Sequence, residues 1–481
     1  MGAIVRSIPN WFRERAQTGF LLALAAFFCV FHASVFKAHF GPDEMMNLYG
    51  HWHRPLWQTA VAEVRFWSKT VRPMGAIYYL PLYRAFGLNP VPFHAARCAI
   101  LGVNTVVFFK LAKAVVRSRW ASVLAAFPIA YHSTTGNLHY DGAFIYDALC
   151  GTFYFWALLY YVRSRRGSGR GGLRAGQTGL FLALYICALD SKEMAVSLPV
   201  LVLAYELLFQ GRRAKVGPAM AAGAITLVFI LGKTIGPGAL THLDAYRPVF
   251  RWERFAGANT RFLNTIFYTD LFNSGRVLGL WIALLYAGLR NWGLRKFDPR
   301  WLFLLIWAVV TPLPLAFLPD RGGGTLYIVA GGWGMLAALA LRAVVRRFAR
   351  QPVAGLPRRA IMAAGLAGCI AAYWHETARQ DRKLTRWYLE NGQETQRIIA
   401  QMSKLGERPP SHSRVVFLND PFTGYDMLFI AALVWRDPTI DIHLQRMHAL
   451  PEAELAQAKY VFDYVDGRFA PVKWPALVKS W

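Results

Sequence analysis

Apolar runs long enough to cross a lipid bilayer, or nearly so, recur along most of this chain. A helix needs about 20 residues to span the hydrocarbon core. Only 17% of the residues are charged, against roughly 25% in soluble proteins. The chain is therefore predicted to be a polytopic α-helical membrane protein. Its eleven predicted spans are about 19–38, 91–115, 120–133, 143–162, 176–189, 194–209, 216–235, 276–291, 301–318, 325–341 and 360–374.

Lysine and arginine gather in every second loop between these runs. Cytoplasmic loops of membrane proteins carry this excess, so a cytoplasmic N-terminus is predicted. The basic loops are 110–119, 163–174, 212–215, 290–300 and 342–359. The loops that then face outward are 39–90, 134–142, 190–193, 236–275 and 319–324. Much of the net charge of +27 follows from this topology. The predicted surroundings are the lipid bilayer of the inner (plasma) membrane, with no nucleic-acid partner.

Two further segments have an organisation of their own. In the outer loop 39–90, residues 57–69 are predicted to form an amphipathic helix in the membrane interface, and residues 73–86 a second interfacial or re-entrant element. Residues 375–481 follow the last span and are predicted to lie outside. They contain strand-like segments at 414–420 and 459–464. The predicted domains are therefore 1–374, a transmembrane domain, and 375–481, an accessory α/β domain on the periplasmic (extracytoplasmic) side.

The first outer loop opens with two adjacent carboxylates, Asp43 and Glu44. Ionisable groups at the mouth of a span are candidates for function, although such a pair can also simply cap a helix. Further acids lie at other span ends on the same predicted side. Acids from five loops or span ends on one leaflet favour one shared polar cavity over separate solvated side chains. These further acids are Asp141, Asp147, Asp190, Glu193 and Asp320.

A polar cavity beside an interfacial helix suits a lipid-linked substrate whose phosphate lies at the membrane surface. Lys192 and Arg321 are placed to meet such a phosphate. Asp43 is the candidate general base for an acceptor hydroxyl or amine. A second carboxylate beside it is expected to raise the pKa of one of the two.

Five short motifs follow one another in this order along residues 1–345. They are Gly41-Pro42-Asp43-Glu44, Arg72-Pro73 with the segment 86–94, Asp147 at the head of a span, the hairpin Asp190-Ser191-Lys192-Glu193, and Arg321 with Leu326-Tyr327. With them the chain resembles the GT-C-fold membrane glycosyltransferases. It is most similar to the protein O-mannosyltransferase superfamily and to bacterial relatives of the transmembrane mannosyltransferases that carry tetratricopeptide repeats. Those repeats are missing here.

The resemblance implies a GT-C-like fold and transfer of a hexose, such as mannose, from a polyprenyl-phosphate-linked donor. The acceptor would be an unidentified glycan, lipid or protein outside the cytoplasm. Asp43 would be the catalytic base with Glu44 as its partner, and Lys192 and Arg321 would bind the donor phosphate. The residues that would line the cavity or orient the acceptor are Arg72, Asp141, Asp147, Glu193 and Tyr327.

Alternatives remain open at the level of sequence. Lys192 and Glu193 also fit a local ion pair, Asp147 a helix cap, and Arg321 a contact with lipid headgroups. His51 and His53 fit a divalent metal site or, more simply, a membrane anchor, and the mannosyltransferase resemblance implies no metal cofactor. For the whole chain, a transporter or flippase of lipid-linked intermediates is the main alternative, and a non-catalytic scaffold is a third.

Overall fold

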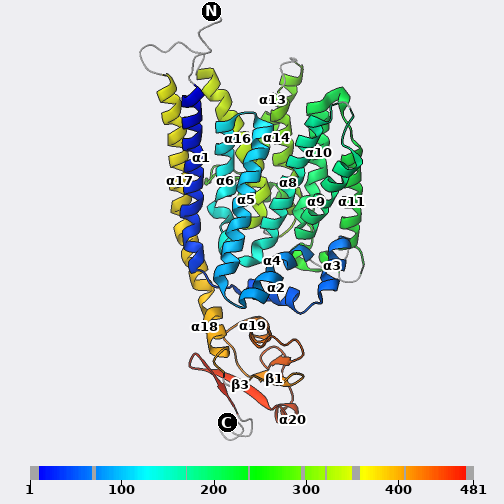
Figure 1. The fold of residues 1–481 in the computed structure, drawn as a ribbon, viewed down its shortest axis with the longest axis vertical. Helices are drawn as coiled ribbons and strands as arrows, with labels where there is room; N and C mark the ends of the chain where they lie inside the picture. Colours follow the sequence, from blue (N-terminus) through cyan, green and yellow to red (C-terminus); the bar gives the residue numbers. More distant parts are fainter. Residues whose placement is uncertain are drawn as a thin grey trace, which may run out of the picture.

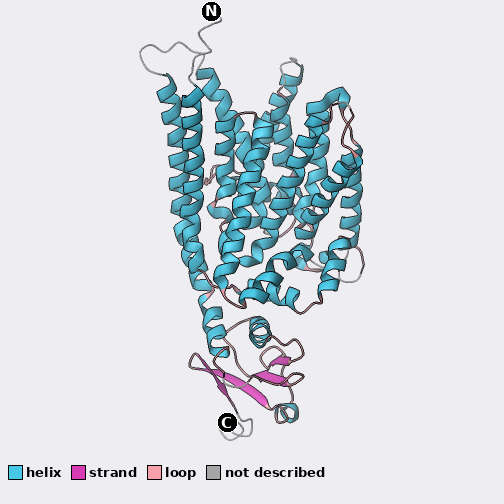
Figure 2. Ribbon diagram, in the orientation of Figure 1, coloured by secondary structure: helices cyan, strands magenta, loops and turns pink. Residues whose placement is uncertain are grey.

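The structure is a computed structural model of the chain, and it describes residues 10–67, 72–169, 171–236, 239–293, 298–319, 322–348, 358–405 and 408–472. Long helices stand side by side in a bundle, and a small part rich in strands lies beyond one end of it (Figure 1). Among the described residues, the strands all belong to this C-terminal part (Figure 2).

Every predicted span coincides with one long helix or with a pair of consecutive helices. These are α1 (Asn10–His32), α5 (Pro90–Val116), α6 (Arg119–Ala130), α8 (Ile145–Gly167), α9 (Ala175–Ser191), α10 (Leu198–Tyr205) with the π-helical turn η7 (Glu206–Gln210), α11 (Gly217–Thr234), α13 (Ser274–Gly293), α14 (Pro299–Val310) with α15 (Leu313–Ala316), α16 (Tyr327–Phe348) and α17 (Arg358–Asn391).

Seven stretches of the described helices are long and apolar enough to cross a membrane. They contain α1, α5, α8, α10, α11, α14 and α16. The remaining predicted spans fall on α6, α9, α13 and α17. The polytopic α-helical class is thus confirmed, and the number of eleven spans stays a prediction.

Shorter elements occupy the segments between the spans. The helices among them are α2 (Pro42–Trp52), α3 (Leu56–Val64), α4 (Ala76–Phe86), α7 (Asn137–Tyr140) and α12 (Trp252–Ile266). The single 3-10 turns are η2 (Ala33–Lys37), η3 (Pro73–Gly75), η4 (Ser133–Thr135), η5 (Gly142–Phe144), η6 (Glu193–Ser197), η8 (Gly211–Arg213), η9 (Leu240–His242), η10 (Asp244–Tyr246) and η11 (Gly323–Leu326). The two predicted interfacial segments contain α3 and α4, which lie with α2 across the lower end of the bundle (Figure 1).

Aromatic contacts hold the N-terminal helix in the bundle. The ring of Phe27 in α1 lies 5.1 Å from that of Phe127 in α6 and 5.2 Å from that of Trp374 in α17, between centroids. Inside a bilayer such packing, rather than the hydrophobic effect, drives the association of helices. These contacts agree with the view in Figure 1, where α1 and α17 run side by side.

The C-terminal part contains a four-stranded sheet with the strand order β2-β1-β3-β4. The central strand β1 (Arg414–Phe417) pairs in parallel with β2 (Asp441–Leu444) and β3 (Tyr460–Val465), whereas β4 (Arg468–Pro471) is antiparallel to β3. The helices around the sheet are α18 (Gln393–Met402), α19 (Asp426–Trp435) and α20 (Glu452–Leu455). The two strand-like segments of the sequence are therefore β1 and β3, as predicted.

Helix α19 connects this part to the bundle by packing on α2. The rings of Tyr49 and Phe429 lie 5.3 Å apart, and the hydroxyl of Tyr83 donates to the carbonyl oxygen of Leu433. Helix α17 runs through the predicted domain boundary at 374 and continues to Asn391, so the chain leaves the bundle as a helix. The division into two domains at that residue stays a prediction.

Candidate functional site

Helix α2 presents its two acids in different directions. Gly41 is the N-cap and Pro42 the first residue of the helix, so Asp43 and Glu44 lie in its first turn, where negative charge is favourable. Consecutive helical residues point about 100° apart. Asp43 is exposed, whereas Glu44 is completely buried with Met45, Leu48 and His51. The acidic pair is thus divided between an open and a packed face.

The open face of α2 borders a cavity of about 440 Å³. The cavity gathers residues from four of the predicted outer loops and from the neighbouring span ends. Its lining is made of Asp43, Met46, Asn47, Arg72, Ala143, Phe144, Lys192, Glu193, Met194, Tyr246, Pro314, Leu315, Leu318, Gly322 and Thr325. Among the residues that sequence singled out, Asp43, Arg72, Lys192 and Glu193 therefore share one cavity.

Each of the two cations in this cavity has a carboxylate partner. The Nζ atom of Lys192 lies 2.6 Å from Oδ2 of Asp147, and Nη2 of Arg72 lies 3.4 Å from Oε2 of Glu193. Asp147 lies behind the cavity wall and is 4% exposed. Lys192 and Arg72 both line the cavity while keeping these ion pairs.

Arg72 is held by its surroundings in an unusual backbone conformation. Its φ of 55° is in the left-handed region, which costs a non-glycine residue of order 1 kcal/mol and is concentrated at functional sites. Its Nη2 donates to the hydroxyl of Tyr246 over 3.0 Å, and its Cζ lies 5.6 Å from the ring centroid of Tyr146. Burial lowers the pKa of Arg72, but Glu193, Tyr246 and Asp147 more than offset this, so that the pKa is raised and the side chain stays charged.

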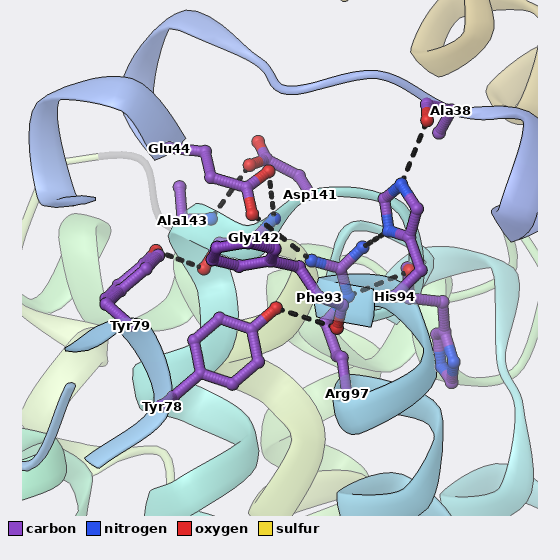
Figure 3. Close-up of polar contacts among 11 residues, drawn as sticks. Ala38, Glu44, Tyr78, Tyr79, Phe93, His94, Arg97, Asp141, Gly142 and Ala143 are labelled. Atoms are coloured by element: carbon purple, nitrogen blue, oxygen red, sulfur yellow. Dashed lines mark hydrogen bonds and ion pairs between the residues drawn. The ribbon is translucent and has the colours of Figure 1, made fainter. Parts of the chain in front are cut away.

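The packed face of α2 is fixed by a buried polar cluster (Figure 3). Oε2 of Glu44 accepts a hydrogen bond from the backbone N–H of Gly142 over 3.1 Å, and Oε1 lies 3.7 Å from Nη1 of Arg97. Burial raises the pKa of Glu44 to about 7. The positive charge of Arg97 lowers this pKa and offsets only part of the increase, and the negative charge of Asp141 raises it further. Glu44 therefore faces α5 and the start of α8, away from the cavity.

Asp141 lies between this cluster and Asp43. Its Oδ1 accepts from the backbone N–H of Ala143 over 2.8 Å, which caps the turn η5. Burial raises the pKa of Asp141 to about 6, and the negative charge of Asp43 adds to the shift. Asp141 is not among the residues that line the cavity.

Two other predicted site residues have different surroundings. Tyr327 is 1% exposed, and its hydroxyl donates to the carbonyl oxygen of Ile129 over 3.2 Å, which places it inside the helix bundle rather than in the cavity. Arg321 lies outside the described residues. Its neighbours Gly322 and Thr325 do line the cavity.

The two histidines of the first outer loop are engaged separately. His51 is buried and shares a hydrogen bond of 2.9 Å with the hydroxyl of Tyr146, and burial lowers its pKa to about 4. His53 donates from Nδ1 to the carbonyl oxygen of Tyr49 over 2.7 Å. Within the described ranges, no three His, Cys, Asp or Glu residues are grouped as metal ligands.

Sequence reasoning missed Arg97, Tyr246 and Asn47. Arg97 carried a signal, because it is a charged residue inside a long apolar run, and such residues in membrane spans are normally paired and functional. Tyr246 and Asn47 carried none, since polar residues are ordinary in an outer loop.

Comparison with known proteins places the fold. No family model matches the chain, and no curated protein matches it. Among solved structures, ArnT from Cupriavidus metallidurans bound to undecaprenyl phosphate aligns over 98% of this chain and 95% of its own, with 14% identity and a TM-score of 0.53. The same protein in the apo state gives a TM-score of 0.55 at 13% identity, over 96% of this chain and 95% of that one.

A second neighbour is the archaeal oligosaccharyltransferase AglB from Archaeoglobus fulgidus, in complex with an inhibitory peptide and a dolichol-phosphate. It aligns over 89% of this chain and 64% of its own length, with 11% identity and a TM-score of 0.52. Likeness at this level of identity shows the fold. The chain thus has the GT-C-like architecture of a multi-span membrane protein with a small C-terminal α/β part.

Proposed function

We propose that this protein is a glycosyltransferase, which moves a sugar from a polyprenyl-phosphate-linked donor to an acceptor outside the cytoplasm. Asp43 acts as the general base, and Lys192 and Arg72 bind the donor phosphate, with Arg321 as a further phosphate ligand. A hexose such as mannose is the proposed sugar. The acceptor is a glycan, a lipid or a protein.

One observation carries the proposal: an exposed carboxylate and two anchored cations from distant parts of the sequence border the same cavity. Cations at the end of a helix bundle suit a phosphate that lies at the membrane surface while its prenyl tail stays in the bilayer. A carboxylate that is free to reach substrate suits the removal of a proton from an acceptor. The fold agrees, because the structural neighbours were solved with undecaprenyl phosphate and with a dolichol-phosphate.

The proposed chemistry is a displacement at the anomeric carbon of the sugar. Asp43 takes the proton of the acceptor hydroxyl or amine, and the freed electron pair attacks that carbon. The bond from the carbon to the phosphate oxygen breaks, and its electrons leave with the polyprenyl phosphate. Lys192 and Arg72 stabilise the negative charge that develops on the leaving phosphate. Preorganised cations lower a reaction barrier most when they lie where charge develops in the transition state.

The other residues of the cavity have supporting roles in this proposal. Asp147 and Glu193 hold Lys192 and Arg72 in place through the two ion pairs. Each of these two cations is thus balanced by its own carboxylate, and Asp43 adds one negative charge to the cavity. Asp141 is close enough to Asp43 for the negative charge of Asp43 to raise its pKa. Its proposed role is to orient the acceptor.

We further propose that the protein lies in the inner (plasma) membrane with its N-terminus in the cytoplasm. The cavity and the α/β part then both face the periplasmic side, where an accessory role for residues 375–481 is proposed.

Donor turnover is the test of this function. The purified protein in lipid nanodiscs is incubated with a panel of polyprenyl-phosphate sugars and with membrane extract as acceptor. Transfer of one sugar, with release of polyprenyl phosphate, is expected. Absence of transfer from every donor, together with movement of lipid-linked sugars across protein-containing vesicles, would instead identify a flippase.

A further inference from the structure

A single buried guanidinium, that of Arg97, joins the segments that surround the proposed site (Figure 3). Arg97 lies two turns into α5 and is 0% exposed. Its Nη1 faces Glu44 of α2, and its Nε donates to the carbonyl oxygen of His139 in α7 over 3.0 Å. Its Nη2 contacts Nδ1 of His94 at 2.5 Å, and the other ring nitrogen of His94 contacts the carbonyl oxygen of Ala38.

Glu44 is the residue of α2 that contacts this cluster. The helix begins without a side-chain cap, since its N-cap is Gly41. Instead, Oε2 of Glu44 accepts a hydrogen bond from the N–H of Gly142, and Oε1 lies 3.7 Å from Nη1 of Arg97, in an ion pair without a hydrogen bond. Because Asp43 is the preceding residue on the same helical turn, the rotation of α2 that buries Glu44 also turns Asp43 toward the cavity.

Gly142 is the second residue that this cluster holds in place, through both of its backbone polar groups. Its N–H donates to Glu44, and its carbonyl oxygen accepts from the hydroxyl of Tyr79 over 2.8 Å. A methyl group at this position would collide with the carboxylate of Glu44. Gly142 opens the turn that leads into α8, whose first turn carries Asp147, the partner of Lys192. The contacts of Glu44 therefore fix the position of α2 relative to the start of α8.

We propose that Glu44 and Arg97 are positioning residues, which fix the distance between the carboxylate of Asp43 and the cation Lys192 without touching substrate. This inference rests on the proposed function. It replaces the expectation that Glu44 shares the proton chemistry of Asp43. A geometry held in this way matters because a displacement of about 1 Å in a reacting group can cost on the order of 100-fold in rate.

The chain offers a matched control at the opposite end of α8. Arg165 in the last turns of that helix forms an ion pair of 2.8 Å with Glu206, and both side chains are 0% exposed. Like Glu44, Glu206 also accepts a backbone hydrogen bond, from Lys215 over 2.7 Å. Both are completely buried Arg–Glu pairs, although the Glu206 pair is shorter and hydrogen-bonded. The Glu44 pair adjoins the proposed site, whereas the Glu206 pair lies at the other end of α8.

The experiment compares Glu44→Leu, Glu44→Gln and Gly142→Ala with Glu206→Leu, all as full chains in nanodiscs. Glu44→Leu removes the acceptor of the Gly142 hydrogen bond, whereas Glu44→Gln keeps an acceptor oxygen. Gly142→Ala displaces the carboxylate and leaves every charge in place. For each variant, kcat, the donor KM and the melting temperature are measured on the folded fraction isolated by gel filtration.

Glu44→Leu and Gly142→Ala are expected to lower kcat by roughly 10- to 100-fold, with little change in donor KM, while Glu44→Gln restores most of the rate. Glu206→Leu is expected to lower the melting temperature and to keep the wild-type kcat. If Glu44→Leu fails to fold, the kcat of Gly142→Ala alone tests the proposal.

The proposal is overturned if Glu44→Leu and Gly142→Ala keep the wild-type kcat, or if Glu206→Leu loses as much kcat as they do. It is also overturned if Glu44→Gln is as slow as Glu44→Leu, because the carboxylate itself would then be required. Failure of the proposed function looks different, since the wild type itself would then transfer sugar from no donor; transfer by Asp43→Asn at the wild-type rate would refute only the role of Asp43 as the base.

Discussion

Asp43 and Glu44 are neighbours in sequence, but Asp43 lies on the open face of α2 and Glu44 on its packed face. The sequence predicted a catalytic pair in which one acid perturbs the other. In the structure the pKa of Glu44 is raised mainly by burial, with Asp141 as the contributing acid. The prediction of one shared role could not have been refined from sequence, because it depends on which face of α2 packs and on Arg97, more than 50 residues further along the chain.

Titration of Glu44 is expected to make the stability of the protein fall as the pH rises. The pKa of Glu44 is about 7 in the folded state, against 4.5 for the free side chain. The folded state therefore binds more protons than the unfolded state between about pH 5 and pH 7, so stability decreases across this window, by up to about 3 kcal/mol. Glu44→Gln removes this contribution.

Melting temperatures of the wild type and of Glu44→Gln, followed from pH 5 to pH 8, measure the effect. The wild type should lose stability relative to the variant as the pH rises. Parallel curves for the two proteins would mean that the carboxyl of Glu44 does not titrate in this range.

Replacement of Lys192 by methionine is expected to weaken donor binding. Loss of a charge-assisted hydrogen bond to phosphate removes about 1.5–3 kcal/mol, which corresponds to roughly a 10- to 100-fold rise in donor KM. Steady-state kinetics with varied donor concentration check this. Arg212→Met, at an exposed cation near η8, is the control, and an equal rise in both variants would argue for general attraction of the donor by charge.

At the scale of elements, the long helices and the two interfacial segments that contain α3 and α4 could be predicted, whereas the face that α2 packs could not. The eleven apolar runs coincide with helices because an apolar segment in a membrane must pair its backbone polar groups internally, which a helix does. By contrast, α2 is amphipathic and short, and its buried face contacts Arg97 through Glu44 and the ring of Tyr79 through His51, both from other helices. The unbroken passage of α17 across residue 374 to Asn391 was also missed, since the change from apolar to charged composition near residue 375 resembles the end of a membrane span.

The contact between α19 and α2 is expected to hold the C-terminal part on the bundle. Phe429→Ala removes the ring that packs on Tyr49, and aromatic pairs of this kind contribute about 0.5–1.5 kcal/mol beyond their buried area. The variant should be cleaved faster than the wild type by limited proteolysis in the segment 403–413. Tyr425→Ala, at the exposed start of α19, serves as the control, and equal cleavage of all three proteins would contradict the assignment.

At the scale of the whole molecule, loops that are far apart in sequence meet in one cavity at one end of the bundle. The sequence predicted this gathering from the sidedness of the basic loops, and the lining of the cavity by segments near residues 43, 72, 143, 192, 246 and 325 agrees with it. The separation of Tyr327 from the cavity could not be predicted, because a helix start points its first side chain either inward or outward according to its packing.

Cysteine labelling in intact cells tests the proposed orientation of the molecule. In a variant without native cysteines, Gln457→Cys in the exposed C-terminal part should react with a membrane-impermeant maleimide. Arg212→Cys, at the other end of the bundle, should react only after the membrane is opened. The reverse pattern would place the cavity and the α/β part in the cytoplasm.

The most direct measurement is the rate of sugar transfer by Asp43→Asn relative to the wild type, with Asp441→Asn in the exposed sheet edge as the control. The amide keeps the size of the side chain and removes the base. The account predicts a loss of at least about 100-fold for Asp43→Asn, as expected when a general base is removed, with the control near the wild-type rate. Transfer by Asp43→Asn at the wild-type rate would contradict it.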